Sequence, residues 1–127
     1  MRMVAYIEDV PGVAAESARW ELYRLLGEPR RLRLLGLTSE DELSLGELAE
    51  LTREAQPNVS KHLKQLREAG LVAVRRQGTR AFARLSPELN GDPVVADAIQ
   101  SGRELCVRDG SLGRVPEVIR ARDADAR

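Results

Sequence analysis

The sequence predicts a mainly α fold with one small β-hairpin, an α+β arrangement, and three observations indicate it. Apolar residues recur at helical spacing over most of the chain, whereas strand periodicity is confined to residues 71–85. At 127 residues, the chain can bury one modest core without a disulfide or a structural metal ion. We expect an irregular lead over residues 1–13, one domain over residues 14–109, and a short helix with a frayed end over residues 110–127.

The first two helices are expected to supply much of the core. Ala18, Leu22 and Leu25 recur at helical spacing, and Gly27 ends this run in the way that a residue just past a helix does. Pro29 fits the first turn of a second helix, because its missing N–H is not needed there. The leucines of the second helix are Leu32, Leu34, Leu35 and Leu37. They leave little polar surface, so we expect a core helix.

A third and a fourth helix are expected after a polar loop with the sequence TSEDELS. Ser44 lies three residues before Glu47, the spacing of a capping box, in which each side chain bonds to the other residue's backbone N–H. The buried stripe of the third helix comprises Leu45, Leu48, Ala49 and Leu51. Pro57 fits the first turn of the fourth helix, which Gly70 closes. The apolar side of the fourth helix comprises Val59, Leu63 and Leu66.

The hairpin and two further helices are expected after Gly70. The sequence LVAVRRQGTRAFARL alternates around a Gln-Gly-Thr turn. Its apolar positions include Val72, Val74, Phe82 and Leu85. Pro93 is a plausible start for a long helix, which Gly102 interrupts at some cost and Gly110 breaks. A last short helix is expected from about Pro116 to Arg122.

The order helix, turn, helix, hairpin over residues 45–85 is typical of a winged helix-turn-helix, a unit that usually places one helix in a DNA major groove. The charge distribution supports this interpretation. The whole chain is neutral, but residues 57–85 contain seven basic residues and one acidic residue. A basic surface confined to one helix and the adjoining hairpin is the expected footprint of a phosphate-binding face. The alternative is a charged face that contacts only solvent.

Candidate DNA contacts lie on the fourth helix and on the hairpin. The candidates for phosphate or groove contacts are Lys61, Lys64, Arg75, Arg76, Arg80 and Arg84. Gln56, Asn58 and Ser60 lie near the start of the helix, where side chains commonly reach base edges. Asn and Gln can form two hydrogen bonds with adenine. For each single residue, a spectator or capping role is the alternative.

The sequence offers little for catalysis or metal binding. His62, the only histidine, is expected to border the core or to touch a phosphate. Cys106, the only cysteine, is most simply a small core residue, and the alternative is a redox sensor if two copies meet there. No nucleophile–base pair, ligand cluster or glycine-rich phosphate loop is present, so we predict no enzyme, cofactor or metal. A leader and an apolar run of membrane-spanning length are also lacking, which predicts a cytoplasmic protein.

The chain resembles the ArsR/SmtB family of small prokaryotic transcriptional repressors over residues 27–85. The resemblance lies in the segments GEPRRLRLLGL, LSLGELAEL, QPNVSKHLKQLREAGLV and VRRQGTRAFARL, in the family's order and spacing. It implies a homodimer assembled through the first and last long helices. It also implies that the helix over residues 57–69 enters the major groove and that the hairpin is a wing on the minor groove or backbone. The candidate dimer residues are Trp20, Tyr23, Val95 and Ile99.

The chain departs from the family at two places. Arg53, Glu54 and Ala55 stand where members commonly carry Gly, an aliphatic residue and Ser. Either the third helix therefore runs on before it bends, or the angle between the helices differs. In addition, LSLGELAEL lacks the thiolate pair that many relatives use for sensing. The similar phrase ELCVRDG has Arg108 where a second Cys would stand, which makes it a poor zinc site.

We therefore predict a sequence-specific transcriptional regulator, most simply a repressor, that binds a palindromic double-stranded DNA operator as a homodimer in a prokaryotic cytoplasm. An effector, if one exists, could be a small molecule, an oxidant or a partner protein. The alternative is a winged-helix module for protein–protein interaction that does not bind DNA.

Overall fold

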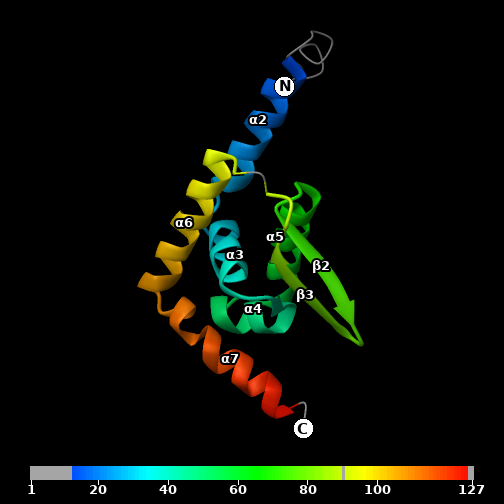
Figure 1. The fold of residues 1–127 in the computed structure, drawn as a ribbon, viewed down its shortest axis with the longest axis vertical. Helices are drawn as coiled ribbons and strands as arrows, with labels where there is room; N and C mark the ends of the chain where they lie inside the picture. The colour runs from blue at the N-terminus through cyan, green and yellow to red at the C-terminus, as the bar shows by residue number, and fades with distance from the viewer. Residues whose placement is uncertain (1–12, 90, 126–127) are drawn as a thin grey trace.

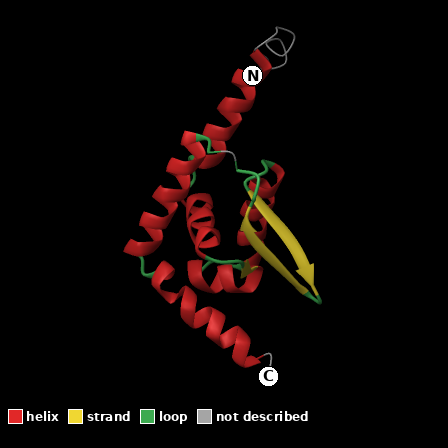
Figure 2. Ribbon diagram, viewed as in Figure 1, coloured by secondary structure: helices red, strands yellow, loops and turns green. Residues whose placement is uncertain are grey.

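The computed structural model describes residues 13–89 and 91–125. The predicted irregular lead lies outside this part of the chain except for Val13. The elements are α2 (Val13–Leu26), α3 (Pro29–Glu40), β1 (Leu43–Ser44), α4 (Leu45–Thr52), α5 (Gln56–Glu68), β2 (Val72–Gln77), β3 (Arg80–Leu85), α6 (Pro93–Arg108) and α7 (Ser111–Asp125). The predicted class, a mainly helical fold with a small β-sheet, is confirmed (Figure 2).

Helix α3 is the centre of the fold (Figure 1). It contacts α2, α4, α5, α6, α7 and β3. Leu35 and Leu37 of α3 are completely buried, which confirms the predicted core helix. Helix α6 runs beside α3 on one side, whereas α5 and the hairpin lie on the other side. Among the described residues, no helix is both long and apolar enough to span a membrane.

Helices α3 and α6 cross at two glycines. A Cβ atom built on Gly36 would lie 2.5 Å from the carbonyl carbon of Gly102. A Cβ atom on Gly102 would overlap the carbonyl oxygen of Leu32. Helix α6 continues through Gly102, in agreement with the single long helix that the sequence predicts. The cost in helix propensity is accepted because only glycine permits this close approach of the two backbones.

The two ends of α4 differ in how well the sequence predicts them. The capping box is confirmed: the N–H of Glu47 donates to Ser44 Oγ at 3.1 Å, and the N–H of Ser44 donates to Glu47 Oε1 at 2.8 Å. Helix α4 does not run on, because Arg53 adopts φ 56° and ψ 38° and ends the helix in the left-handed region. The helix α5 then begins at Gln56, after Ala55, whose side chain forms no cap.

The sheet has three strands, in the order β1-β3-β2, where the sequence predicted only a hairpin. Strand β1 pairs with β3 through Leu43 opposite Ala83 and Ser44 opposite Phe82. Two residues are too few to show a strand period, and the preceding loop was therefore predicted to run through this segment. The hairpin register, Gln77 opposite Arg80, is that of a tight two-residue turn.

Helix α7 is longer than predicted and belongs to the core. It covers 15 residues and contains Pro116, at which the sequence predicts the start of a short helix because proline favours the first turn. Here the proline lies inside the helix, where it cannot donate a hydrogen bond to the carbonyl of Leu112. Val115 and Ser111 are 1% exposed, and α7 packs on α3, α4 and α6. Residues 111–125 are therefore a docked helix.

Candidate nucleic-acid interface

Helix α5 has one buried and one exposed side. Val59, Leu63 and Leu66 pack into the core, because they recur at i, i+4 and i+7. The predicted contact residues on this helix are all exposed: Gln56, Asn58, Ser60, Lys61 and Lys64. The helix therefore presents a polar, basic surface on the side away from the core.

Two grooves bring this surface together with the wing, which we define as residues 72–85. The first groove, of about 230 Å³, lies between α5 and the sheet and includes Ser60, Lys64, Arg67 and Arg76 in its lining. The second, of about 450 Å³, is lined by residues of α4, α7 and the wing, together with Gln56. Arg76 lines both grooves, so residues of α5 and the wing form one continuous surface.

The basic residues of the wing are not equivalent. Arg75 Nε donates to both carboxylate oxygens of Glu42, at 3.0 and 2.9 Å, and Arg84 Nε lies 4.0 Å from the same carboxylate. The hydrogen bond from Arg75 lowers the pKa of the Glu42 carboxyl. Arg76 and Arg80 form no salt bridge with any described residue. The structure thus leaves Arg76 and Arg80 more available to a phosphate than Arg75.

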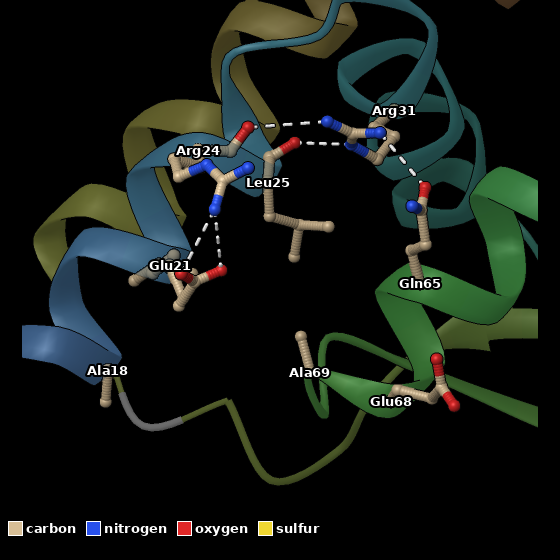
Figure 3. A pocket seen from close by; sticks show the side chains of 9 residues that line it. Ala18, Glu21, Arg24, Leu25, Arg31, Gln65, Glu68 and Ala69 are labelled. Carbon is tan, nitrogen blue, oxygen red and sulfur yellow. Dashed lines mark hydrogen bonds and ion pairs between the residues drawn. The ribbon is translucent and has the colours of Figure 1, made fainter. Parts of the chain in front are cut away.

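The helix α5 is anchored from α3 by Arg31 (Figure 3). Its guanidinium donates to the carbonyl oxygens of Arg24 and Leu25 at the end of α2, and to Gln65 Oε1 of α5 at 3.0 Å. Its Nη1 also lies 3.3 Å from His62 Nδ1. His62 is 9% exposed and borders the core, one of its two predicted roles. An open cleft of about 630 Å³ separates α2 from α5 beside these contacts.

The four candidate dimer residues divide into two kinds. Trp20 and Tyr23 on α2 are 61% and 51% exposed, which leaves large aromatic surfaces for a partner. Val95 is 6% exposed and lies in the core of its own chain, and Ile99 packs against the same core. Val95 therefore has almost no surface left for a second copy. Sequence periodicity could not separate these cases, because both helices have an apolar side.

Cys106 is a core residue, and the structure does not favour the redox interpretation. The residue has 0% exposure, and its thiol donates to the carbonyl oxygen of Arg33 at 3.6 Å. Burial raises the pKa of the thiol, which disfavours the reactive thiolate. In the described parts of the chain, no group of three or more His, Cys, Asp or Glu side chains could hold a metal ion.

Sequence reasoning missed a cluster of charged residues that connects α7 to this surface. Arg122 Nε of α7 donates to Glu47 Oε2 at 2.8 Å, and its Nη2 donates to the carbonyl oxygen of Glu42 at 3.1 Å. Its guanidinium lies 5.2 Å from the ring centre of Phe82, and that of Arg75 lies 4.8 Å from it. No local pattern could have indicated these pairs, because 75 residues separate Arg122 from Glu47.

The ionisation of Glu47 gives a testable acid dependence. Burial alone would raise the pKa of the Glu47 carboxyl, but the hydrogen bonds from Arg122 and Ser44 outweigh it and lower the pKa. Glu47 therefore stabilises the fold above the pKa of an unfolded glutamate, about 4.3, and this stability is lost as the pH falls through the lower folded value. We expect E47Q, which can keep the capping box, to be less stable at pH 7 and to lose less stability on acidification.

Urea denaturation followed by circular dichroism between pH 7 and pH 3 measures this. E50Q, which neutralises an exposed carboxylate on the same helix, is the control. An E47Q curve parallel to that of the unmodified protein would contradict the prediction.

The chain is similar in sequence to known helix-turn-helix transcriptional regulators. A family model described as a helix-turn-helix domain matches residues 26–75. The HTH-type transcriptional regulator KmtR of Mycobacterium tuberculosis is 43% identical over 68 residues, which are 54% of this chain and 52% of that protein. The biofilm growth-associated repressor of Agrobacterium fabrum is 36% identical over 85 residues, which are 65% of this chain and 73% of that protein.

A solved structure extends the similarity to the fold. The homodimeric winged helix-turn-helix DNA-binding domain of Mb0332 from Mycobacterium bovis is described as that of a possible ArsR-family transcriptional regulator. It matches with a TM-score of 0.60 at 25% identity, over 75% of this chain and 83% of that one. The alignment with KmtR, by contrast, spans about half the length of that relative.

Proposed function

The chain belongs to the ArsR family of winged helix-turn-helix transcriptional regulators, and from this premise we propose that it is a repressor that binds a double-stranded DNA operator as a homodimer. The observation that carries the proposal is the exposed surface formed by α5 and the wing. It combines amide side chains with basic residues that have no salt-bridge partner among the described residues. The amides can hydrogen-bond to base edges, and the basic residues can bind the phosphates of the DNA backbone.

The proposed complex follows from the placement of these residues. Helix α5 would enter the major groove with Asn58 and Ser60 toward base edges and Lys61 and Lys64 toward phosphates. The wing would reach the adjacent backbone through Arg76 and Arg80. Two copies related by a two-fold axis would read half-sites about 34–36 Å apart, which requires a palindromic operator.

The proposed dimer uses α2, whose Trp20 and Tyr23 are exposed. We propose residues 14–109 as the DNA-binding and dimerisation unit, acting in a prokaryotic cytoplasm, with α7 docked on it. An effector would have to bind two dimer states with different affinity in order to release the operator. The burial of Cys106 favours a small molecule or a protein over an oxidant in this role.

Fluorescence anisotropy tests the proposal directly. The purified protein is titrated into a labelled duplex from upstream of its own gene and into a scrambled duplex, over a series of salt concentrations. A preference of about a hundredfold or more, with a steep salt dependence, is expected of a specific regulator. Weak and equal binding to both duplexes would contradict the proposal and would favour the alternative, a protein–protein interaction module.

The substitution Asn58→Ala tests base readout separately from phosphate binding. If Asn58 forms two hydrogen bonds with a base, its loss costs about 1–3 kcal/mol on the operator, which is roughly 5- to 150-fold in affinity. Binding to scrambled DNA and the salt slope should not change, because no charge is removed. Gln100→Ala, which removes an exposed amide on α6, is the matched control. An equal loss on both duplexes would remove Asn58 from the base contacts.

A further inference from the structure

Arg122 joins α7 to three other parts of the fold. Its guanidinium bonds to the Glu47 carboxylate of α4 through both Nε and Nη2, and to the carbonyl oxygen of Glu42 just before β1. It also lies over the ring of Phe82 in β3. The Arg122 and Glu47 side chains are only 23% and 11% exposed, so solvent screens this pair less than an exposed one.

The ring of Phe82 is the part of the wing that contacts Arg122. Phe82 is 5% exposed, and two guanidiniums contact it, Arg122 from α7 and Arg75 from β2. Arg75 is in turn held by the carboxylate of Glu42. Contacts therefore connect α7 to β3, β3 to β2, and β2 to Glu42, the residue just before β1.

Glu47 connects the same series to the helix-turn-helix. Its Oε1 accepts the N–H of Ser44 in the capping box of α4, while both oxygens accept from Arg122. One carboxylate thus fixes the start of α4 and the position of Arg122. Because Arg122 also contacts Phe82 of β3, this one side chain connects the wing to the start of helix α4.

We propose that Arg122 is a positioning residue for DNA binding, which holds the wing where Arg76 and Arg80 reach the same duplex as α5. This inference rests on the proposed function. Arg122 itself is not assigned a DNA contact, because its Nε and Nη2 already donate to Glu47 and to the carbonyl of Glu42. Arg76 and Arg80 line the groove that Arg122 closes from the α7 side.

A double-mutant cycle between Arg122 and Arg80 distinguishes positioning from general stabilisation. At 0.1 M salt, the loss of one phosphate contact is expected to weaken binding about eightfold, from the release of about 0.9 counterion per contact. R80A should show this loss. R122A should weaken binding by more, up to about 60-fold, because a displaced wing loses the contacts of both Arg76 and Arg80. Adding R80A to R122A should then cost less than about twofold, because the wing has already lost its contacts.

Losses that multiply in the double variant, or an R122A protein that binds as tightly as the unmodified one, would overturn the positioning role. R120A, which removes an exposed charge from the same helix, is the matched control and should leave affinity unchanged. Thermal unfolding confirms that each variant is folded in the assay. If R122A does not fold, R122Q, whose amide can still donate to Glu47, replaces it. Unmodified protein that binds no duplex would instead overturn the proposed function, and this role with it.

Discussion

Replacing Gly102 with alanine is expected to destabilise the protein by about 3 kcal/mol, the upper end of the usual cost of overpacking a core. A Cβ atom at this position would meet the carbonyl group of Leu32 and would lie 3.1 Å from the backbone N of Gly36. These are backbone atoms of α3, which cannot rotate away as a side chain can. The two helices would have to separate, and the surrounding core would lose contacts. Urea denaturation followed by circular dichroism measures the free energy of unfolding.

Gly113→Ala is the matched control for this prediction. Gly113 is exposed in α7, and a Cβ atom there would have no neighbour within 4 Å. The same chemical change should therefore stabilise the protein by up to about 1 kcal/mol, through helix propensity alone. A G102A variant that is as stable as G113A would show that the crossing of α3 and α6 is not as close as described.

The crossing of α3 and α6 also bears on the proposed DNA binding. Helix α3 carries Arg31, which holds Gln65 of α5 by a hydrogen bond at 3.0 Å. Helix α6 begins beside α2, since Arg19 of α2 pairs with Asp92 at the start of α6. The contact at Gly102 thus joins α3, which anchors α5, to α6, which pairs with the proposed dimer helix α2. In a G102A protein that still folds, the relative position of the two α5 helices of the proposed dimer is expected to be less well defined.

The fold could be predicted from the sequence where the signal was local. Ser44 and Glu47 are three residues apart and bond to each other's backbone, so their spacing alone predicted the start of α4. Pro57 predicted the first turn of α5, also from a local signal, because proline favours that position. By contrast, Arg53 in the left-handed region could not be predicted, because the tertiary structure imposes a conformation that its own side chain disfavours.

The candidate site was predictable in composition but not in pairing. The exposed side of α5 followed from the helical spacing of its apolar residues, which fixes the side that faces solvent. The neutralisation of Arg75 could not be predicted, because Glu42 lies 33 residues away and becomes its partner only when β1 joins the sheet. The same holds for Arg122, whose partners lie in α4, in β3 and in the loop before β1. Long-range ion pairs depend on the tertiary fold, and local residue spacing does not show which distant charges the fold brings together.

Removing both lysines of α5 is expected to weaken binding strongly, on the operator and on scrambled DNA alike. Lys61 and Lys64 are exposed and form no salt bridge with another described residue. If each neutralises one phosphate, K61A/K64A loses about 1.8 units of salt slope. At 0.1 M salt, this corresponds to about a 60-fold loss of affinity, on operator and scrambled DNA alike, because phosphates carry no sequence information.

The equal loss on both duplexes is what separates this double variant from Asn58→Ala. The control is R108A/R120A, which removes the same number of positive charges from exposed positions on α6 and α7. If net charge alone attracted DNA, the control would flatten the salt slope as much as K61A/K64A does. That result would contradict the phosphate contacts proposed for Lys61 and Lys64. If α5 lies in the major groove, only K61A/K64A flattens the slope, because counterions are released where cations meet phosphates and not elsewhere.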